Sequence, residues 1–193
     1  MRLLKFLVTA VFILVAAVPS IVRAEMPEIS AGEMYFDIFK GHYVLKGNVY
    51  VSANNHGFRA VVTADEALVS VVKQRCRAQG NVKLLQEDIV FSCDRAFLQW
   101  QTKTAEVVGS VAFENKDNIA ITSDSAIFNW QEKIVDFYGT INLKAQDVQL
   151  AEGVTLDGED YQHIQYNVVE NIILAADKTF TAPEIIIPDE NGV

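Results

Sequence analysis

Proline and cysteine are scarce in this chain, and both shortages narrow the possible folds. The 193 residues contain four prolines, and none lies between Pro27 and Pro183. Because proline cannot donate a hydrogen bond to a sheet, a long stretch without it suits continuous strand pairing. The two cysteines, Cys76 and Cys93, have no metal-ligand neighbours at usable spacing. The sequence therefore predicts a sheet protein with no metal site and no cofactor.

Catalytic motifs are also missing. The chain has no nucleophile elbow, no HExxH and no phosphate-binding glycine loop. Of its three histidines, His42 and His56 each stand beside a glycine, as turn residues do, and His163 lies between positions expected to face inward and outward. We therefore expect a protein that is not an enzyme and has no catalytic residues.

Basic residues are few. The chain has 16 of them against 25 acidic residues, for a formal charge of −9. Loss of the first 24 residues would remove Arg2, Lys5 and Arg23 and no acid, leaving −12. Phosphate backbones repel such a surface, and no basic stripe with interleaved aromatics occurs, so we expect no nucleic-acid partner.

The one long apolar run lies at the N-terminus. A basic start, Met1 to Lys5, is followed by apolar residues up to Val18, then by Pro19 and a small-residue exit at Ala24. This order is typical of a secretory signal peptide, residues 1–24, followed by a single domain over residues 25–193. The alternative is a retained inner-membrane anchor, because the run is nearly long enough to span a bilayer.

What the chain does contain is a repeat. Four strand-like phrases begin at Gly47, Gly80, Gly109 and Gly139. A second phrase begins at Asp65, Asp94 and Asp124, and each of these lies fifteen residues before the next of those glycines. The unit is about 30 residues long, with polar clusters between its segments that suit hairpin loops.

Apolar residues alternate within both phrases, so each strand has one apolar face. We read that face as inward. Val71, Trp100 and Trp130 occupy one column of it, which is either plain core or the lining of an apolar groove for acyl chains. Cys76 and Cys93 also face inward, as buried thiols or as a disulfide. The aspartates are expected to accept hydrogen bonds from backbone amides; a catalytic ladder of acids is the alternative.

The repeat weakens at both ends. Gly32 stands where an aspartate would be, and Met34, Phe36 and Ile38 follow at inward positions. Near the other end, Asp160 leads a last unit that places Ile164 and Tyr166 inward, with Ala175 at the glycine position. The strongly β-prone segment 185–187 is expected to form a sheet edge open to another strand.

These phrases resemble the LptA/OstA family of lipopolysaccharide-transport proteins. The closest matches are Tyr43 to Val51 and Thr122 to Phe128, followed by Phe137 to Gly139. The resemblance covers roughly residues 29–175. It implies an all-β fold: a β-jellyroll of repeated antiparallel strands in two facing sheets that form an open trough.

The same resemblance implies a function. Members carry lipopolysaccharide through the periplasm from the inner to the outer membrane, with the acyl chains in the trough and without catalysis. They join LptC-like and LptD-like partners through sheet edges and can associate head to tail. We carry over only the inward columns as candidate lipid-binding residues: Ile38, Val49, Val69, Val71, Val82, Leu84, Leu98, Trp100, Val111, Phe113, Phe128, Trp130, Ile141 and Leu143.

Three alternatives stay open from the sequence. The first is an LptC-like component, anchored in the inner membrane and facing the periplasm. The second is a structural β-solenoid that polymerises without lipid. The third is a β-helix enzyme acting on polysaccharides, which would need its acids clustered on an exposed face.

Overall fold

The computed structural model describes residues 28–189, except 56–57, 87–88, 117–118 and 147. The expected signal peptide and His56 lie outside the described residues. The described chain is all-β, as the sequence predicts. Its strands are β1 (Glu28–Ser30), β2 (Glu33–Asp37), β3 (His42–Asn55), β4 (Phe58–Ser70), β5 (Arg75–Gln86), β6 (Ile89–Gln99), β7 (Thr104–Glu114), β8 (Ala120–Asn129), β9 (Ile134–Lys144), β10 (Gln149–Leu150), β11 (Tyr161–Asn167) and β12 (Ile172–Asp177).

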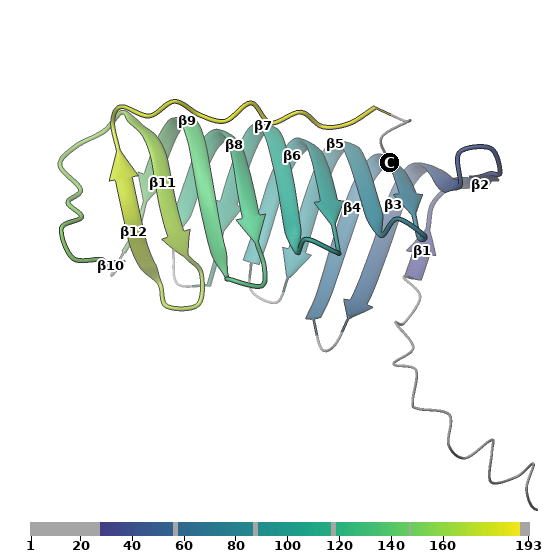
Figure 1. The fold of residues 1–193 in the computed structure, drawn as a ribbon, viewed down its shortest axis with the longest axis horizontal. Helices are drawn as coiled ribbons and strands as arrows, with labels where there is room; N and C mark the ends of the chain where they lie inside the picture. The colour runs from purple at the N-terminus through teal and green to yellow at the C-terminus, as the bar shows by residue number, and fades with distance from the viewer. Residues whose placement is uncertain (1–27, 56–57, 87–88, 117–118, 147, 190–193) are drawn as a thin grey trace, which may run out of the picture.

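All twelve strands belong to one sheet (Figure 1). From β3 to β9 each strand pairs antiparallel with the next, and β11 and β12 continue the row. At the N-terminal edge, β1 and β2 both pair with β3, β1 along Tyr50–Ser52 and β2 along His42–Lys46. At the other edge, the short β10 pairs parallel with β12.

Each long strand bends where its repeated phrase begins, at the glycine in β3, β5, β7 and β9 and at the aspartate in β4, β6 and β8, and we call this bend the corner. The pairing register shifts there between every pair of strands from β3 to β9. The glycines have positive φ, between 69° for Gly47 and 91° for Gly139, a conformation that side chains with a Cβ rarely adopt. The corners fold the sheet into two facing layers that share the same strands.

We name the layers by what closes them. The turn layer ends in the tight turns 71–74, 100–103, 130–133 and 168–171, and includes 66–70, 75–79, 95–99, 104–108, 125–129 and 134–138. The loop layer ends near residues 56–57, 87–88 and 117–118, and includes 82–86, 89–93, 111–114 and 120–123. The predicted two facing sheets are thus the two layers of one continuous sheet.

The aspartates explain why the glycines recur. The Asp124 side chain lies across Gly139, where an added Cβ would come within 2.7 Å of Asp124 Cβ and Cγ. Asp65 covers Gly80 and Asp94 covers Gly109 in the same way. Asp124 Oδ2 accepts a hydrogen bond from the Thr140 backbone N–H at 2.9 Å, which agrees with the structural role expected for these acids.

The ends of the chain differ from expectation in two ways. Gln162, not Asp160, stands at the last corner, because Tyr161 pairs with Ile141 and His163 with Tyr138. Residues 185–187 form no edge strand. The segment after β12 runs back across the row of strands (Figure 1), and Ile187 packs on Leu68 and Phe97 on the outer side of the turn layer. Tertiary contact here overrides the β propensity of three successive isoleucines.

Candidate lipid-binding interior

The space between the two layers is filled by apolar side chains. They come from positions flanking each corner, so that Val49, Val82, Val111 and Ile141 in the loop layer face Leu45, Ala78, Val107 and Phe137 in the turn layer. All eight are at most 4% exposed. The repeat therefore builds one apolar surface that runs along the whole row of strands.

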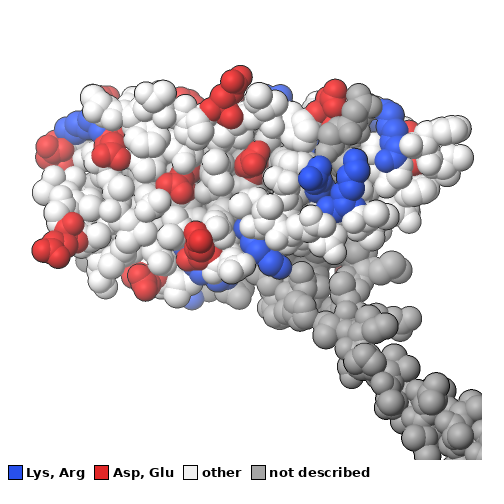
Figure 2. All heavy atoms as spheres, viewed as in Figure 1, with Lys and Arg blue, Asp and Glu red and all other residues white. Residues whose placement is uncertain are grey.

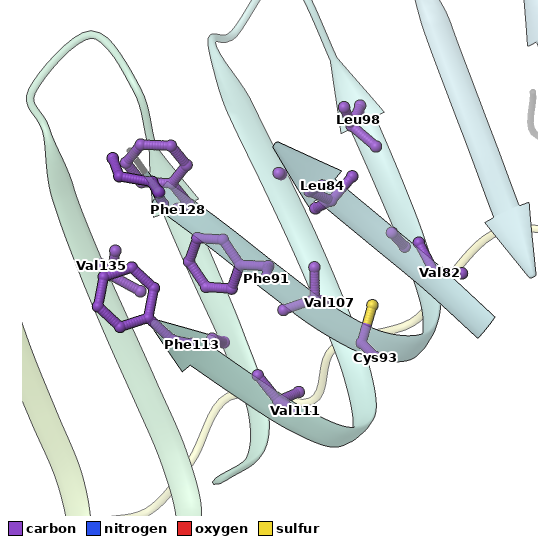
Figure 3. Packing of buried hydrophobic residues seen from close by; sticks show 14 of the residues in the cluster. Val82, Leu84, Phe91, Cys93, Leu98, Val107, Val111, Phe113, Phe128 and Val135 are labelled. Carbon is purple, nitrogen blue, oxygen red and sulfur yellow. The ribbon is translucent and has the colours of Figure 1, made fainter. Parts of the chain in front are cut away.

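Aromatic rings join the layers at the centre of this interior. Phe91 and Phe113 of the loop layer have ring centroids 5.0 Å apart, and Phe91 lies 5.7 Å from Phe128 of the turn layer. Phe113 meets Phe137 and Tyr166 edge to face at 5.5 and 5.8 Å. Figure 3 shows Phe91, Phe113 and Phe128 among the aliphatic side chains around them. Such pairs add about 0.5–1.5 kcal/mol each beyond burial of their area.

Opposite the corners lies the side where the two layers are not joined by the strands, and we call it the mouth. Its turn-layer rim is a ladder of tight turns: Trp100 N–H donates to Gln74 O at 3.0 Å, Trp130 N–H to Lys103 O at 3.0 Å, and Val168 N–H to Lys133 O at 2.9 Å. Trp100 and Trp130 are buried at this rim. The ladder fixes the rim as one continuous edge.

A hydrogen-bonded clasp ties the two rims together. The Tyr166 hydroxyl accepts from Asn115 Nδ2 at 2.8 Å and donates to Asn171 Oδ1 at 3.0 Å. Asn115 lies in the loop layer, and Asn171 in a tight turn of the turn layer. The clasp therefore crosses the mouth from one layer to the other.

Beside the rim lies a small apolar recess, lined by Leu84, Phe91, Phe128 and Trp130 among others. Its volume is about 20 Å³, room for roughly one water molecule. Among the buried polar atoms without a hydrogen-bond partner are Oε1 of Gln86, which lines the recess, and Nε1 of Trp100. Among the described residues, the side chains of the two layers thus pack against each other with little space around this recess, and we call this arrangement the closed form.

Twelve of the fourteen candidate residues are buried or packed on this interior: Val49, Val69, Val82, Leu84, Leu98, Trp100, Val111, Phe113, Phe128, Trp130, Ile141 and Leu143. Ile38 and Val71 are not. Ile38 is 74% exposed because it lies in the turn after β2, and Val71 is 37% exposed at the first of the tight turns. Met34 and Phe36 are also about half exposed. The inward prediction fails for these residues because no further described strand covers the outer side of β2.

Phe91 and Phe137 are not among the fourteen candidate residues, although they are among the largest fully buried side chains. Phe91 lies three residues before Asp94, and Phe137 two residues before Gly139. Extending the period of two backwards from Ile141 reaches Phe137. From Ala96 it reaches Ser92 and not Phe91, because the pairing register shifts between Ser92 and Arg95 at the corner. Cys76 and Cys93 are buried and free, so the disulfide does not form. Burial raises the pKa of each thiol to about 12.

A cluster of ionisable side chains, His163, Asp136 and Asp177, lies outside this interior. His163 bonds Asp136 at 2.9 Å and Asp177 at 3.0 Å, and Phe180 stacks on its ring at 4.2 Å. Burial lowers the pKa of His163, but hydrogen bonds to Asp136 and Asp177 outweigh this and raise the pKa above its usual value. Among the described residues, no group of three or more His, Cys, Asp or Glu side chains could hold a metal ion.

The outer surface is unevenly charged. In the view of Figure 2, acidic side chains are spread along the molecule, and most of the basic ones lie over the half that holds the N-terminal strands. Within the described part of the chain there is no helix of the length and apolarity that a membrane crossing needs.

Comparison with known proteins supports the fold. No protein-family model and no curated protein matches the sequence. Among solved structures, the chain is similar to LptH of Pseudomonas aeruginosa, described as the LptA homologous periplasmic component of the conserved lipopolysaccharide transport device. The TM-score is 0.56 at 11% sequence identity, and the match covers 62% of this chain and 94% of LptH. The predicted LptA-like β-jellyroll is confirmed as a fold.

Proposed function

We propose that this protein binds the acyl chains of lipopolysaccharide between its two layers and passes the lipid through the periplasm without chemical change. The observation that carries the proposal is the continuous apolar surface shared by both layers, which is bounded on one side by a mouth rather than by a corner. The fold shared with LptH, a component of a lipopolysaccharide transport device, supports the same function. Residues 1–24 would export the chain.

The polar atoms at the mouth suit a lipid with a polar head. A buried donor or acceptor without a partner costs about 1–3 kcal/mol. Trp100 Nε1 and Gln86 Oε1 both lack partners. Hydroxyl or amide groups of a lipid head could satisfy them while the acyl chains enter beside Trp130. The partner would be an LptC-like or an LptD-like protein that pairs with this chain through a sheet edge.

The packed interior also favours a second candidate, a structural sheet protein that holds no lipid. The two functions differ in what the inner side chains touch in the cell. We would place a photo-crosslinking amino acid singly at Trp100, Phe113, Phe128 or Trp130, with Ile127 as the control. Ile127 is next to Phe128 in β8 and, because side chains alternate along a strand, points to the outer side.

The lipid carrier predicts lipopolysaccharide adducts at inner positions and none at Ile127, after irradiation of a diderm bacterium that exports the protein. Failure of all four inner positions to crosslink, or equal crosslinking at Ile127, would sink the proposal in favour of the structural protein.

A second variant tests whether the closed form limits lipid binding. Tyr166→Phe removes the hydroxyl of the clasp, at a cost of about 1 kcal/mol in stability, and we expect it to increase the yield of adducts.

A further inference from the structure

The two ends of the folded sheet are built differently. At the C-terminal end, residues 145–160 leave the loop layer, cross the end of the sheet and return to β11 (Figure 1). This segment donates two backbone hydrogen bonds to the outer edge of β12, from Gln149 N–H to Asn171 O at 3.1 Å and from Ala151 N–H to Ile173 O at 2.9 Å. It therefore occupies the beginning of the outer edge of β12, at Ile172 and Ile173.

The same segment seals the interior. Val148, Val154 and Leu156 are partly buried and pack against the core. Asp157 bonds Lys178, which follows β12, at 3.0 Å, so the segment is also held at the C-terminal end of that strand. Residues 145–160 thus cap both the edge and the apolar space behind it.

The N-terminal end has no such cap among the described residues. The outer edge of β2 pairs with no other described strand. Met34, Tyr35, Phe36, Ile38 and Phe39 are 49–93% exposed there. At about 150–250 Å² for a large side chain, they present roughly 600 Å² of apolar surface, close to the 800 Å² or so that each partner buries in a stable interface.

We propose that residues 145–160 are a built-in stopper, so that this chain joins another sheet only through β2, as the last member of a row, and does not polymerise head to tail. The inference goes beyond lipid binding and does not depend on it. It replaces the head-to-tail self-association implied by the family resemblance with a single joint at one end.

The occupant of the β2 edge is a sheet of a different protein, and charge is the reason. Two copies pairing antiparallel through β2 about Tyr35 would place Glu33 of one opposite Asp37 of the other. Like charges directly opposite in a sheet are destabilising. The fitting partner strand has an apolar centre and a basic residue at each end.

The test releases the stopper and measures mass against concentration. Gln149→Pro/Ala151→Pro removes both N–H donors to β12 while leaving the core contacts in place. Glu152→Pro is the matched control. Val154 N–H bonds Ala151 O at 3.1 Å and Gly153 has φ of +81°, so Glu152 is the second residue of a turn that favours proline there.

In light scattering at physiological ionic strength, where Glu33 and Asp37 of two copies still repel each other, we expect the wild type and Glu152→Pro to remain monomers of at most 21.5 kDa. The double-proline variant should rise to at least twice its monomer mass with concentration. Adding Met34→Asp/Phe36→Asp to it should restore the monomer, because the joint uses β2. Should the double-proline variant not fold, Leu156→Asp takes its place under the same criteria.

Three outcomes overturn the inference. The first is growth of wild-type mass with concentration, which would show that the end is not stopped. The second is a folded, released variant that stays a monomer. The third is oligomers that survive the β2 substitutions, which would show that they form through another surface. None of these readouts involves lipid, so failure here is separate from failure of the crosslinking experiment.

Discussion

The corners allow a quantitative test, because three corner glycines lie under an aspartate and one, Gly47, does not. Gly139 has φ of +91° and lies under Asp124, whereas Gly47 has φ of +69° and would meet nothing within 4 Å of an added Cβ. Gly32 stands where Gly47 would otherwise have its aspartate. The effects of Gly47→Ala and Gly139→Ala should therefore differ mainly because only the new Cβ at 139 clashes with an aspartate.

The expected magnitudes follow from the geometry. Gly47→Ala should cost about 1–2 kcal/mol, the usual penalty for a left-handed residue with a Cβ. Gly139→Ala adds displacement of the Asp124 carboxylate and loss of its bond from Thr140 N–H, for a total of about 3–4 kcal/mol. The shift in Tm should be about 2–4 °C for each kcal/mol in a chain of this size.

A double-mutant cycle isolates the clash. Asp124→Gly alone should cost about 1–2 kcal/mol, from the lost hydrogen bond and the added freedom of the unfolded chain. Asp124→Gly/Gly139→Ala should cost less than the sum of its parts by about 2 kcal/mol, because the alanine at 139 then meets neither the carboxylate nor the Cβ of residue 124. Urea unfolding followed by the fluorescence of the buried Trp100 and Trp130 gives each free energy. Equal losses for Gly47→Ala and Gly139→Ala, or strict additivity in the cycle, would refute this account of the repeat.

Two further predictions concern ionisable groups. The pKa of His163 is raised in the folded protein, so its contribution to the free energy of unfolding is complete below the unfolded pKa of about 6.5 and disappears as pH rises through the folded pKa. The loss of unfolding free energy caused by His163→Gln, measured by urea titration, should therefore shrink with rising pH. A loss that does not change with pH would contradict the assignment. Burial holds the pKa of the Cys76 and Cys93 thiols at about 12, so iodoacetamide near neutral pH should alkylate them only to the extent that urea unfolds the protein. Rapid alkylation of the native protein would show that the interior opens freely.

The repeated units could be predicted because every local signal in them agrees. Alternation sets the face, glycine marks the corner, and the fifteen-residue step places an aspartate over the glycine of the next strand. These are relations between neighbouring strands, and they hold whatever the ends of the sheet do. This explains why the inner columns from Val49 to Ile141 are buried as expected.

The ends could not be predicted in the same way. Nothing periodic marks residues 145–160, and their parallel return to β12 depends on contacts that only the folded sheet creates. The expected register of the last unit followed the aspartate Asp160, whereas pairing with β9 places Gln162 at the corner. Val71 shares a column with Trp100 and Trp130, yet it is more exposed than either. A period of two tells which side a residue faces, not whether anything covers it.

The distance between the layers could not be predicted from the sequence either, and it determines how acyl chains could enter. The paired residues lie on either side of each corner, and the pairing register breaks at the corner itself, as between Lys46 and Val49. Parting the layers about the corners would therefore leave the ladders within each layer intact. The losses would be the clasp at Tyr166 and the apolar contacts across the interior, and acyl chains would restore the apolar contacts. On this reasoning the closed form is compatible with a carrier, because the cost of opening falls mainly on one hydrogen-bonded clasp.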